Sequence, residues 1–242
     1  MNTIIKVQDL EKVFDNQEVI KHCNINVEKG SIYGFLGANG AGKTTVLKLI
    51  AGLLKPTTGN IMISDMNISE NRNNILRKIG CIIETPIFYE HLSAEENLKI
   101  HNAYMNFYDA DINAVLQKVG LENTGKIQVC KFSLGMKQRL GIARAMIHNP
   151  DILLLDEPIN GLDPMGIKQM RDLFRTLAKE YDMTLIISSH ILSEIEYIAD
   201  TIGIISNGSI LKEIPMSTVK QEFPNGLEEY FFEIMNGGNN CV

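Results

Sequence analysis

A glycine-rich segment near residue 40 constrains the fold of this chain more than any other feature. Residues 37–44 read GANGAGKT and match the pattern G-x-x-x-x-G-K-[ST]. An apolar strand pattern, IYGFL, precedes the segment, and a run with helical apolar spacing, TTVLKLI, follows it. Glycines let the backbone curl so that successive N–H groups point inward, and the helix adds the positive end of its dipole. Strand, loop and helix in this order predict an α/β fold with a cradle for a phosphate chain.

Two side chains of this loop carry the expected chemistry. Lys43 supplies a mobile positive charge for the β- and γ-phosphate oxygens of a triphosphate, and the Thr44 hydroxyl is placed to bind Mg²⁺. The alternative is a glycine-rich turn that binds nothing. The strand and the helix on either side favour the phosphate site.

A second apolar strand ends in two neighbouring carboxylates. Residues 152–157 read ILLLDE, and ligands of α/β sheets bind at the carboxyl ends of the strands. We expect Asp156 to hold Mg²⁺ through water, and Glu157 to face the γ-phosphate and accept a proton from an attacking water. Because neighbouring residues of a strand face opposite ways, the alternative is that one of the two only caps the turn before Pro158.

The remaining pattern predicts the layout of the fold. Residues 3–33 alternate apolar and polar in short bursts, which is typical of strands, and a mostly helical block covers about 93–148. Two further apolar strands, MTLIISSH and TIGIISNGSI, enclose the helical stretch SEIEYIAD. Strands that are apolar on both faces and alternate with helices predict a largely parallel, covered sheet. We expect a β subdomain with the first half of the core, an inserted helical subdomain, the second half of the core and a tail, at residues 1–85, 86–149, 150–215 and 216–242.

The composition excludes several classes of protein. The chain has 242 residues, 45% hydrophobic and 21% charged, which excludes collagen-like chains, disordered chains and disulfide-stapled miniproteins. The longest stretch without a charged residue, 30–42, has thirteen residues, whereas a membrane-spanning helix needs about 20 apolar ones. The net charge of −6, without a Lys/Arg cluster, argues against a nucleic-acid partner.

The cysteines indicate a reducing compartment. Cys23, Cys81, Cys130 and Cys241 are far apart and form no C-x-x-C pair, which is typical of reduced thiols in a cytosol. We expect the first three to be buried. The amino terminus lacks a long apolar core, so we expect no secretory signal.

The order and spacing of these motifs resemble the nucleotide-binding subunit of an ABC transporter over nearly the whole chain. Residues 132–139, FSLGMKQR, are similar to the family signature, L-S-G-G-Q followed by a basic residue, Gln and Arg. Four positions match (Ser133, Gly135, Gln138, Arg139), and three differ (Phe132, Leu134, Met136). Ser133 is a favoured N-cap residue, so a helix that begins here offers its N-terminus to an anion, which in the family is the γ-phosphate held by the other subunit.

The resemblance implies a P-loop, RecA-like α/β domain with an N-terminal antiparallel β subdomain and an inserted helical subdomain. ATP and Mg²⁺ are the implied ligands. The implied ATP-binding residues are Phe14, Gly37, Asn39, Gly40, Ala41, Gly42, Lys43, Thr44 and Thr45. The implied contacts to the partner's site are Ser133, Gly135, Lys137 and Gln138 of the signature and Asp163 of the D-loop.

Two of the implied roles belong to isolated residues. Phe14 matches the aromatic residue that stacks on adenine, and its alternative is a strand residue in a core. His190 lies where the family has its switch histidine, and with Glu157 it forms the implied catalytic pair. The alternative for His190 is a surface histidine or a satisfied core histidine.

The most informative departure from the family is Glu84, where most members have Gln. The residue stands in the segment CIIETP, and a carboxylate is a better ligand for a hard cation than an amide, so we expect Glu84 near Mg²⁺ together with Thr44 and Asp156. The alternative is a neutral surface substitution. This Glu and the segments IYGFLG, SLGMKQRLGIA, DEPINGLDP and LEEYFFEIM are similar to the ATPases of lantibiotic self-immunity and bacitracin-type resistance exporters.

The resemblance implies a head-to-tail homodimer that clasps ATP between one copy's phosphate loop and the other's signature. It implies separate permease subunits that dock near Glu84 and residues 85–94, at the cytoplasmic face of a bacterial membrane. A helical stretch over about 94–105 is the expected wall of the docking groove, or else a stripe that faces the core. The implied function is ATP hydrolysis that powers removal of a peptide antibiotic. Open alternatives are another drug exporter, a soluble ABC ATPase that acts on ribosomes or DNA, and a P-loop kinase or GTPase.

Overall fold

Six strands form the central sheet of the molecule, whose computed structural model describes residues 3–236. Their order in the sheet is β10-β9-β3-β8-β7-β6. The strands are β3 (Ile32–Leu36), β6 (Ile79–Ile82), β7 (Ile152–Asp156), β8 (Thr184–Ser189), β9 (Thr201–Ser206) and β10 (Ser209–Pro215). All neighbouring pairs are parallel except β9 and β10. Every residue of β3 and β8 is buried, so the expected covered and largely parallel sheet is confirmed.

A second sheet of four strands is antiparallel throughout. Its order is β2-β1-β4-β5, formed by β1 (Thr3–Phe14), β2 (Gln17–Glu28), β4 (Thr58–Ile63) and β5 (Met66–Asn67). Asp15 and Asn16 connect β1 to β2 with φ angles of 45° and 65°. A two-residue turn with two positive φ angles matches the right-handed twist of paired strands. The expected antiparallel sheet near the amino terminus is therefore present.

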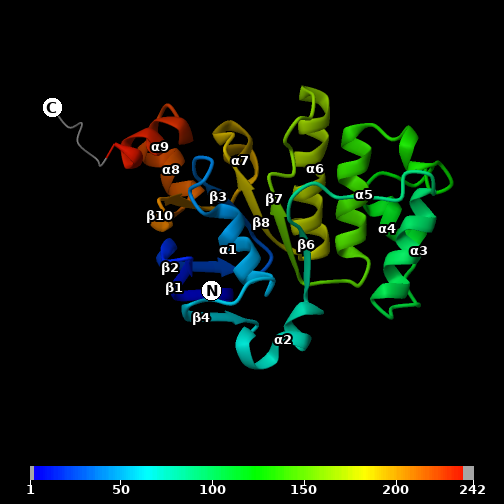
Figure 1. Cartoon of the computed structure of the whole chain (residues 1–242). Helices are drawn as coiled ribbons and strands as arrows, with labels where there is room; N and C mark the ends of the chain where they lie inside the picture. The colour runs from blue at the N-terminus through cyan, green and yellow to red at the C-terminus, as the bar shows by residue number, and fades with distance from the viewer. Residues whose placement is uncertain (1–2, 237–242) are drawn as a thin grey trace.

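Nine helices of the described residues surround the sheets. They are α1 (Lys43–Ile50), α2 (Ile68–Leu76), α3 (Ala94–Tyr104), α4 (Ile112–Lys118), α5 (Leu134–Met146), α6 (Pro164–Tyr181), α7 (Leu192–Ile198), α8 (Met216–Glu222) and α9 (Leu227–Met235). Helices α3, α4 and α5 gather at one end of the molecule, and α8 and α9 lie at the other end (Figure 1). The four-segment division of the chain stays a prediction, with α3 to α5 inside the segment 86–149.

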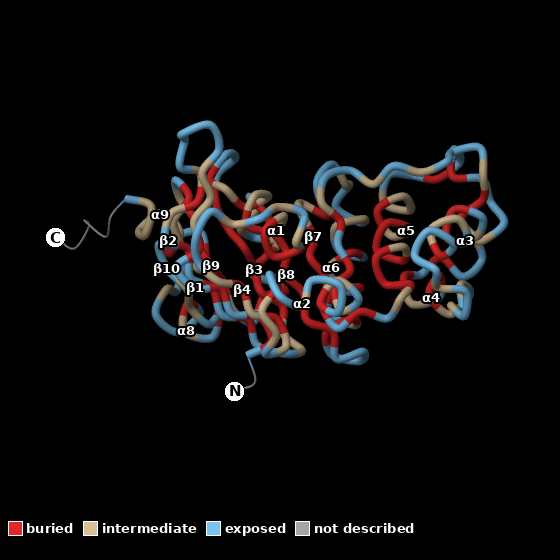
Figure 2. The backbone as a smooth tube through the Cα atoms, turned by 60° about the horizontal axis from the view of Figure 1, so that its bottom comes forward, coloured by how far each residue is buried: buried red, intermediate tan, exposed pale blue. Residues whose placement is uncertain are grey.

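Two apolar cores cover the two faces of the central sheet. Leu153 and Leu155 of β7 join one core with α5 and α6, whereas Ile152 and Leu154 join the other core with α1 and the antiparallel sheet. Alternate residues of a strand face opposite sides, so one strand with four apolar residues in a row serves both cores. Figure 2 shows the buried backbone running through the middle of the molecule. Strand β7 ends at Asp156, which is polar and only partly buried, so its carboxyl end lies at the edge of both cores.

The helical block begins with a strong local signal. Ser93 caps α3: its hydroxyl accepts the N–H of Glu96, and the Glu96 carboxylate accepts the N–H of Ser93. This reciprocal capping satisfies two N–H groups that the helix itself leaves unpaired. The backbone N–H and the hydroxyl of Ser93 both donate to Glu96 Oε2 and lower the pKa of Glu96. Helix α3 therefore begins where the apolar pattern predicted a helix.

Three expectations were wrong. The segment TIGIISNGSI is not one strand but a hairpin of β9 and β10, because Asn207 and Gly208 adopt φ angles of 48° and 84° and reverse the chain. Cys23 is buried, and burial raises its pKa to about 12, but Cys81 and Cys130 are exposed. Cys241 lies outside the described residues.

One structural property bears on membranes. Within residues 3–236, every helix is too short or too polar to cross a lipid bilayer.

Candidate functional site

The phosphate loop, residues 37–44, connects β3 to α1 as the sequence predicted. Gly40 and Gly42 have φ angles of 81° and 109°, which residues with a Cβ rarely adopt. A Cβ on Gly37 would lie 2.5 Å from the Ile205 carbonyl oxygen of β9, so only glycine fits between the loop and that strand. Among the described residues, a Cβ on Gly40 would meet nothing within 4 Å, so this side of the loop is open.

Lys43 reaches back across the loop. Its Nζ atom donates to the carbonyl oxygens of Gly37 at 2.6 Å and Ala38 at 3.2 Å, and the residue is only 5% exposed. The same Nζ lies 3.4 Å from Glu157 Oε1. The ammonium charge of Lys43 therefore lies beside the phosphate loop and is largely shielded from water. A shielded charge acts strongly on a phosphate oxygen.

The two carboxylates meet the loop from the end of β7. The Thr44 hydroxyl donates to Asp156 Oδ2 at 2.7 Å. Glu157 Oε2 lies 2.8 Å from Nδ1 of His190, the residue that follows β8. Among residues 3–236, the buried Oε1 atom of Glu157 has no hydrogen-bond partner. The structure thus brings together Lys43, Thr44, Asp156, Glu157 and His190, as the motifs predicted.

Lys43, Thr44 and Glu157 border a cavity of about 210 Å³, which is also lined by Val19, Asn39, Gly40, Gly42 and Thr45. The Thr44 hydroxyl and the Asp156 carboxylate lie side by side and are oxygen ligands of the kind that Mg²⁺ prefers. Glu157 Oε1 lies 3.4 Å from Lys43 Nζ but makes no hydrogen bond among the described residues, so it can accept a proton. The donor set fits a polyphosphate with Mg²⁺ and a water molecule beside Glu157.

Glu84 pairs with a lysine of α1. Its carboxylate is exposed and accepts a hydrogen bond from Lys48 Nζ at 2.8 Å, and its φ angle is 69°. The hydrogen bond and the charge of Lys48 lower the pKa of Glu84. Lys48 lies on α1, one turn after Thr44, so Glu84 connects the segment after β6 to the helix of the phosphate loop. Its role as a Mg²⁺ ligand stays a prediction.

Phe14 ends β1 with a half-exposed ring. Lys12 Nζ lies 4.7 Å from the ring centroid, and 39% of the residue is exposed. In the described part of the chain it is Val19 of β2, rather than Phe14, that lines the phosphate cavity. An exposed ring is available for stacking, and the adenine contact stays a prediction.

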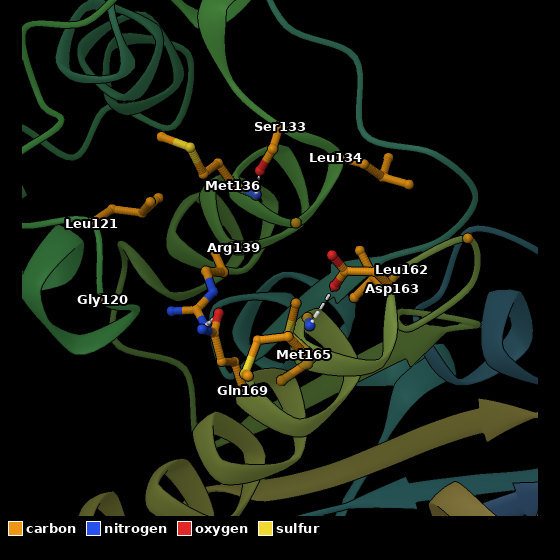
Figure 3. Close-up of a pocket in the computed structure, with 14 residues that line it drawn as sticks. Gly120, Leu121, Ser133, Leu134, Met136, Arg139, Leu162, Asp163, Met165 and Gln169 are labelled. Carbon is orange, nitrogen blue, oxygen red and sulfur yellow. Dashed lines mark hydrogen bonds between the residues drawn. The ribbon is translucent and has the colours of Figure 1, made fainter.

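The signature residues form a second cavity, of about 500 Å³, between α5 and α6. Ser133 caps α5 by accepting the N–H of Met136, and Asp163 caps α6 by accepting the N–H of Gly166. Figure 3 shows Ser133 and Asp163 on opposite sides of this cavity, which Gly135 also lines. Lys137 and Gln138 are not among its lining residues in the described chain. Lys137 pairs with Glu90, and Gln138 is buried.

Arg139 is one of the residues that line the second cavity. Its guanidinium donates to the Val119 carbonyl oxygen at 3.0 Å and to Gln169 Oε1 of α6 at 2.9 Å. Figure 3 shows Arg139 reaching from α5 toward Gln169. The arginine therefore ties the helix that carries the signature to the helix that follows the D-loop.

Sequence reasoning missed Ser188, a buried residue of β8 that contacts the Asp156 carboxylate and the backbone N–H of Glu157. It also missed Lys48 as the partner of Glu84. The position of Ser188, two residues before His190 on an apolar strand, was the one available signal, because strand residues two apart share a face.

Comparisons with known proteins agree with this geometry. Residues 20–160 match the family model described as ABC transporter. The bacitracin transport ATP-binding protein BcrA of Bacillus licheniformis is 53% identical over 229 residues, which are 94% of this chain and 75% of BcrA. The lantibiotic transport ATP-binding protein SrtF of Streptococcus pyogenes is 45% identical over 210 residues, 87% of this chain and 90% of SrtF. A solved dimeric ATP-binding cassette in a post-hydrolysis state, bound to ADP and Pi, superposes with a TM-score of 0.76 at 25% identity and covers 88% of this chain and 98% of that one.

Proposed function

We propose that this chain, which belongs to the ABC transporter family and is an ATPase, powers the export of a peptide antibiotic through separate membrane subunits. The observation that carries the catalytic part is the contact network that joins Asp156 and His190 to Lys43, Thr44 and Glu157, which line the phosphate cavity. The antibiotic class is supported by the two relatives named for bacitracin and lantibiotic transport. Another drug exporter of the bacitracin type is the alternative within this class.

The side chains divide the work of hydrolysis. The N–H groups of the loop and Lys43 hold the β- and γ-phosphates of ATP. Thr44 and Asp156 would hold Mg²⁺, which would supply positive charge to offset that of the phosphate oxygens. Glu157 accepts the proton of the attacking water at Oε1, and His190 holds the other oxygen of that carboxylate.

The site is proposed to be complete only in a homodimer. Within the described chain, the phosphate cavity and the cavity between α5 and α6 have no lining residue in common. The second cavity presents the helix N-terminus capped by Ser133, which is suited to an anion from another molecule. Two copies arranged head to tail place one copy's Ser133 and Asp163 at the other's γ-phosphate.

A groove beside α3 is the proposed dock for a permease subunit. Ile87 and Tyr104 are 84% and 76% exposed on its border. Below them, Arg144 donates to the Ile87 carbonyl oxygen and lies 4.8 Å from the Phe88 ring centroid. Such exposed apolar side chains over a rigid base suit an apolar segment of a membrane protein. The ATPase then sits at the cytoplasmic face of a bacterial membrane.

The export function is tested in the bacterium that carries the gene. Deleting the gene is expected to increase sensitivity to bacitracin or to a lantibiotic, and a plasmid with the wild-type gene restores resistance. The Glu157→Gln variant, expressed at the same level, is expected not to restore it. Unchanged sensitivity to both antibiotic classes, together with co-purification with ribosomes or DNA, would replace the exporter by a soluble ATPase of the family.

A further inference from the structure

We propose that Ser188 is a positioning residue that orients both carboxylates of the ATPase site, a role that rests on the functions proposed above for Asp156 and Glu157. The Ser188 hydroxyl donates to Asp156 Oδ1 at 2.5 Å and accepts the backbone N–H of Glu157 at 2.9 Å. The residue has no exposed surface. Because this buried hydroxyl bonds both residues, it fixes the position of the Asp156 carboxylate relative to the backbone of Glu157.

The register of the sheet places Ser188 opposite the metal-site carboxylate. Asp156 of β7 and Ser188 of β8 are direct partners in the parallel pairing. Two residues earlier on each strand, Leu154 and Ile186 belong to the same apolar core as α1. Asp156, Ser188 and Thr44 of α1 therefore meet on one face of the sheet, where the apolar core gives way to the site.

Two hydroxyl groups fix the plane of the Asp156 carboxylate. Thr44 donates to Oδ2 at 2.7 Å, and Ser188 donates to Oδ1 at 2.5 Å. A rotation of the carboxylate would break both hydrogen bonds, so its orientation is set before any cation arrives. Groups that orient a metal ligand in this way tune metal binding without contacting the metal.

Strand β8 and the residue that follows it also hold Glu157 at its backbone and at its carboxylate. Glu157 has a φ angle of 49°, a costly conformation for a residue with a Cβ, and it turns the backbone N–H toward the Ser188 hydroxyl. At the other end of the residue, His190 Nδ1 lies 2.8 Å from the carboxylate. Because Ser188 and His190 are two residues apart, one short segment supports the backbone and the side chain of the proposed base.

This arrangement predicts which property Ser188 controls. In the described chain, Ser188 does not line the phosphate cavity, and its two hydrogen bonds go to residues other than Lys43. Loss of its hydroxyl should leave metal-free binding of nucleotide unchanged. It should weaken the additional binding that Mg²⁺ provides, and it should lower kcat.

The test uses the full chain and four variants. Ser188→Ala removes the hydroxyl, Ser188→Cys keeps the side-chain size with a much weaker donor, and Ser188→Thr keeps the hydroxyl. The matched control is Thr184→Val on the same strand, which removes a buried hydroxyl that accepts the Gly30 N–H at 2.9 Å, far along the strand from the carboxylates. Each variant is measured for melting temperature, kcat, KM for ATP, and binding of a fluorescent ATP analogue in EDTA and in Mg²⁺.

Ser188→Ala and Ser188→Cys are expected to lower kcat about 10-fold to 100-fold and to reduce the Mg²⁺-dependent gain in nucleotide affinity several-fold. Their binding in EDTA should stay within about twofold of wild type, and Ser188→Thr and Thr184→Val should retain kcat. The proposal is overturned if Ser188→Ala, or Ser188→Cys where the alanine variant does not fold, keeps wild-type kcat and Mg²⁺ dependence. It is also overturned if Thr184→Val loses kcat to the same extent at an equal drop in melting temperature, because the role is then only structural.

A parallel measurement of Glu157→Gln separates this proposal from the one on which it rests. If Glu157→Gln is inactive and Ser188→Ala is fully active, only the role of Ser188 fails. If Glu157→Gln keeps wild-type turnover, the proposed role of Glu157 itself fails, and the role of Ser188 fails with it.

Discussion

Glu157 is the residue at which the contacts of the site converge. Its backbone is held by Ser188, one carboxylate oxygen by His190, and the other lies 3.4 Å from Lys43 Nζ. At the residue scale, the structure therefore holds the proposed base in one orientation, with one carboxylate oxygen that makes no hydrogen bond among the described residues.

Replacing this base should separate binding from hydrolysis. Glu157→Gln is expected to bind ATP normally and to hydrolyse it about 10²–10⁴-fold more slowly, because the amide cannot accept the proton of the attacking water. Phosphate release and nucleotide titration measure the two properties. Asp151→Asn is the control, since it removes a carboxylate just before β7, at the end opposite Asp156, that pairs with Lys78 at the surface. Normal turnover by Glu157→Gln would assign the proton to another group.

Two side-chain contacts lie at the ends of helices and strands that carry proposed site residues. Glu84 follows β6 and pairs with Lys48 of α1, and Ser133 caps α5 at the edge of the second cavity. The exposed ion pair adds little to stability, whereas an N-cap contributes about 1 kcal/mol. At the element scale, the Glu84–Lys48 pair links the segment after β6 to the helix of the phosphate loop, and the Ser133 cap orders the first turn of α5 beside the second cavity.

Glu84→Gln should change coupling rather than ATP binding. Lys48 lowers the pKa of Glu84, so the ion pair is present at neutral pH and is lost as the pH falls through this lowered pKa, below the ordinary value of 4.5. The Glu84–Lys48 ion pair therefore persists from neutral pH down to the lowered pKa of Glu84. Because the pair is exposed, high salt should weaken it. With the permease reconstituted, the variant is expected to bind ATP normally but to respond differently to the transported antibiotic.

The control for Glu84→Gln is Glu95→Gln, which removes an exposed Glu–Lys pair within α3 alone. If both variants keep wild-type coupling, measured as ATP hydrolysed per antibiotic exported, Glu84 has no special function.

The cap of α5 offers a second comparison between elements. Ser133→Ala and Asp111→Ala each remove the N-cap of one helix, α5 and α4, and each should cost about 1 kcal/mol of unfolding free energy. Only Ser133→Ala is expected to lose ATPase activity, because only this cap borders the proposed partner site. Thermal unfolding and steady-state turnover give the two readings. Equal ATPase activity in both variants would show that Ser133 only caps its helix and does not contact the partner's site.

At the scale of the whole molecule, the proposed site is divided between two cavities of one chain. Lys43 lies in one cavity and Ser133 lies at the other. In a pair of copies related by a twofold axis, the phosphate cavity of each copy would face the signature cavity of the other. Such a dimer would contain two complete ATP sites. Hydrolysis should then depend on protein concentration.

Mixing two inactive variants tests this directly. Lys43→Ala loses the charge that holds the phosphates, and Ser133→Ala loses the signature cap. A mixed dimer contains one intact loop facing one intact signature, so the mixture is expected to regain activity that neither variant has alone. The control mixture combines Lys43→Ala with Lys43→Ala,Ser133→Ala, which contains no intact loop. A mixture that stays inactive, or a monomer that hydrolyses ATP at the wild-type rate, would contradict the shared site.

The sequence by itself determined the parts of the site that are contiguous. The loop at 37–44, the strand that ends in Asp156 and Glu157, and the capped helix after Ser133 are each local, because glycine conformations, strand patterns and N-caps depend on neighbours in the chain. The Asn207–Gly208 turn was equally local and could have been predicted. The parallel order of the strands followed from their alternation with helices.

Only the tertiary structure decided which side chains meet across elements. Ser188 reaches Asp156 over 32 positions of the chain, and Lys48 reaches Glu84 over 36. These pairs depend on strand register and on where a helix packs over a sheet, and a slip of one residue in the register would turn Ser188 to the opposite face. Local patterns specify each element, but hydrogen bonds between elements form only after the apolar cores have set their relative positions.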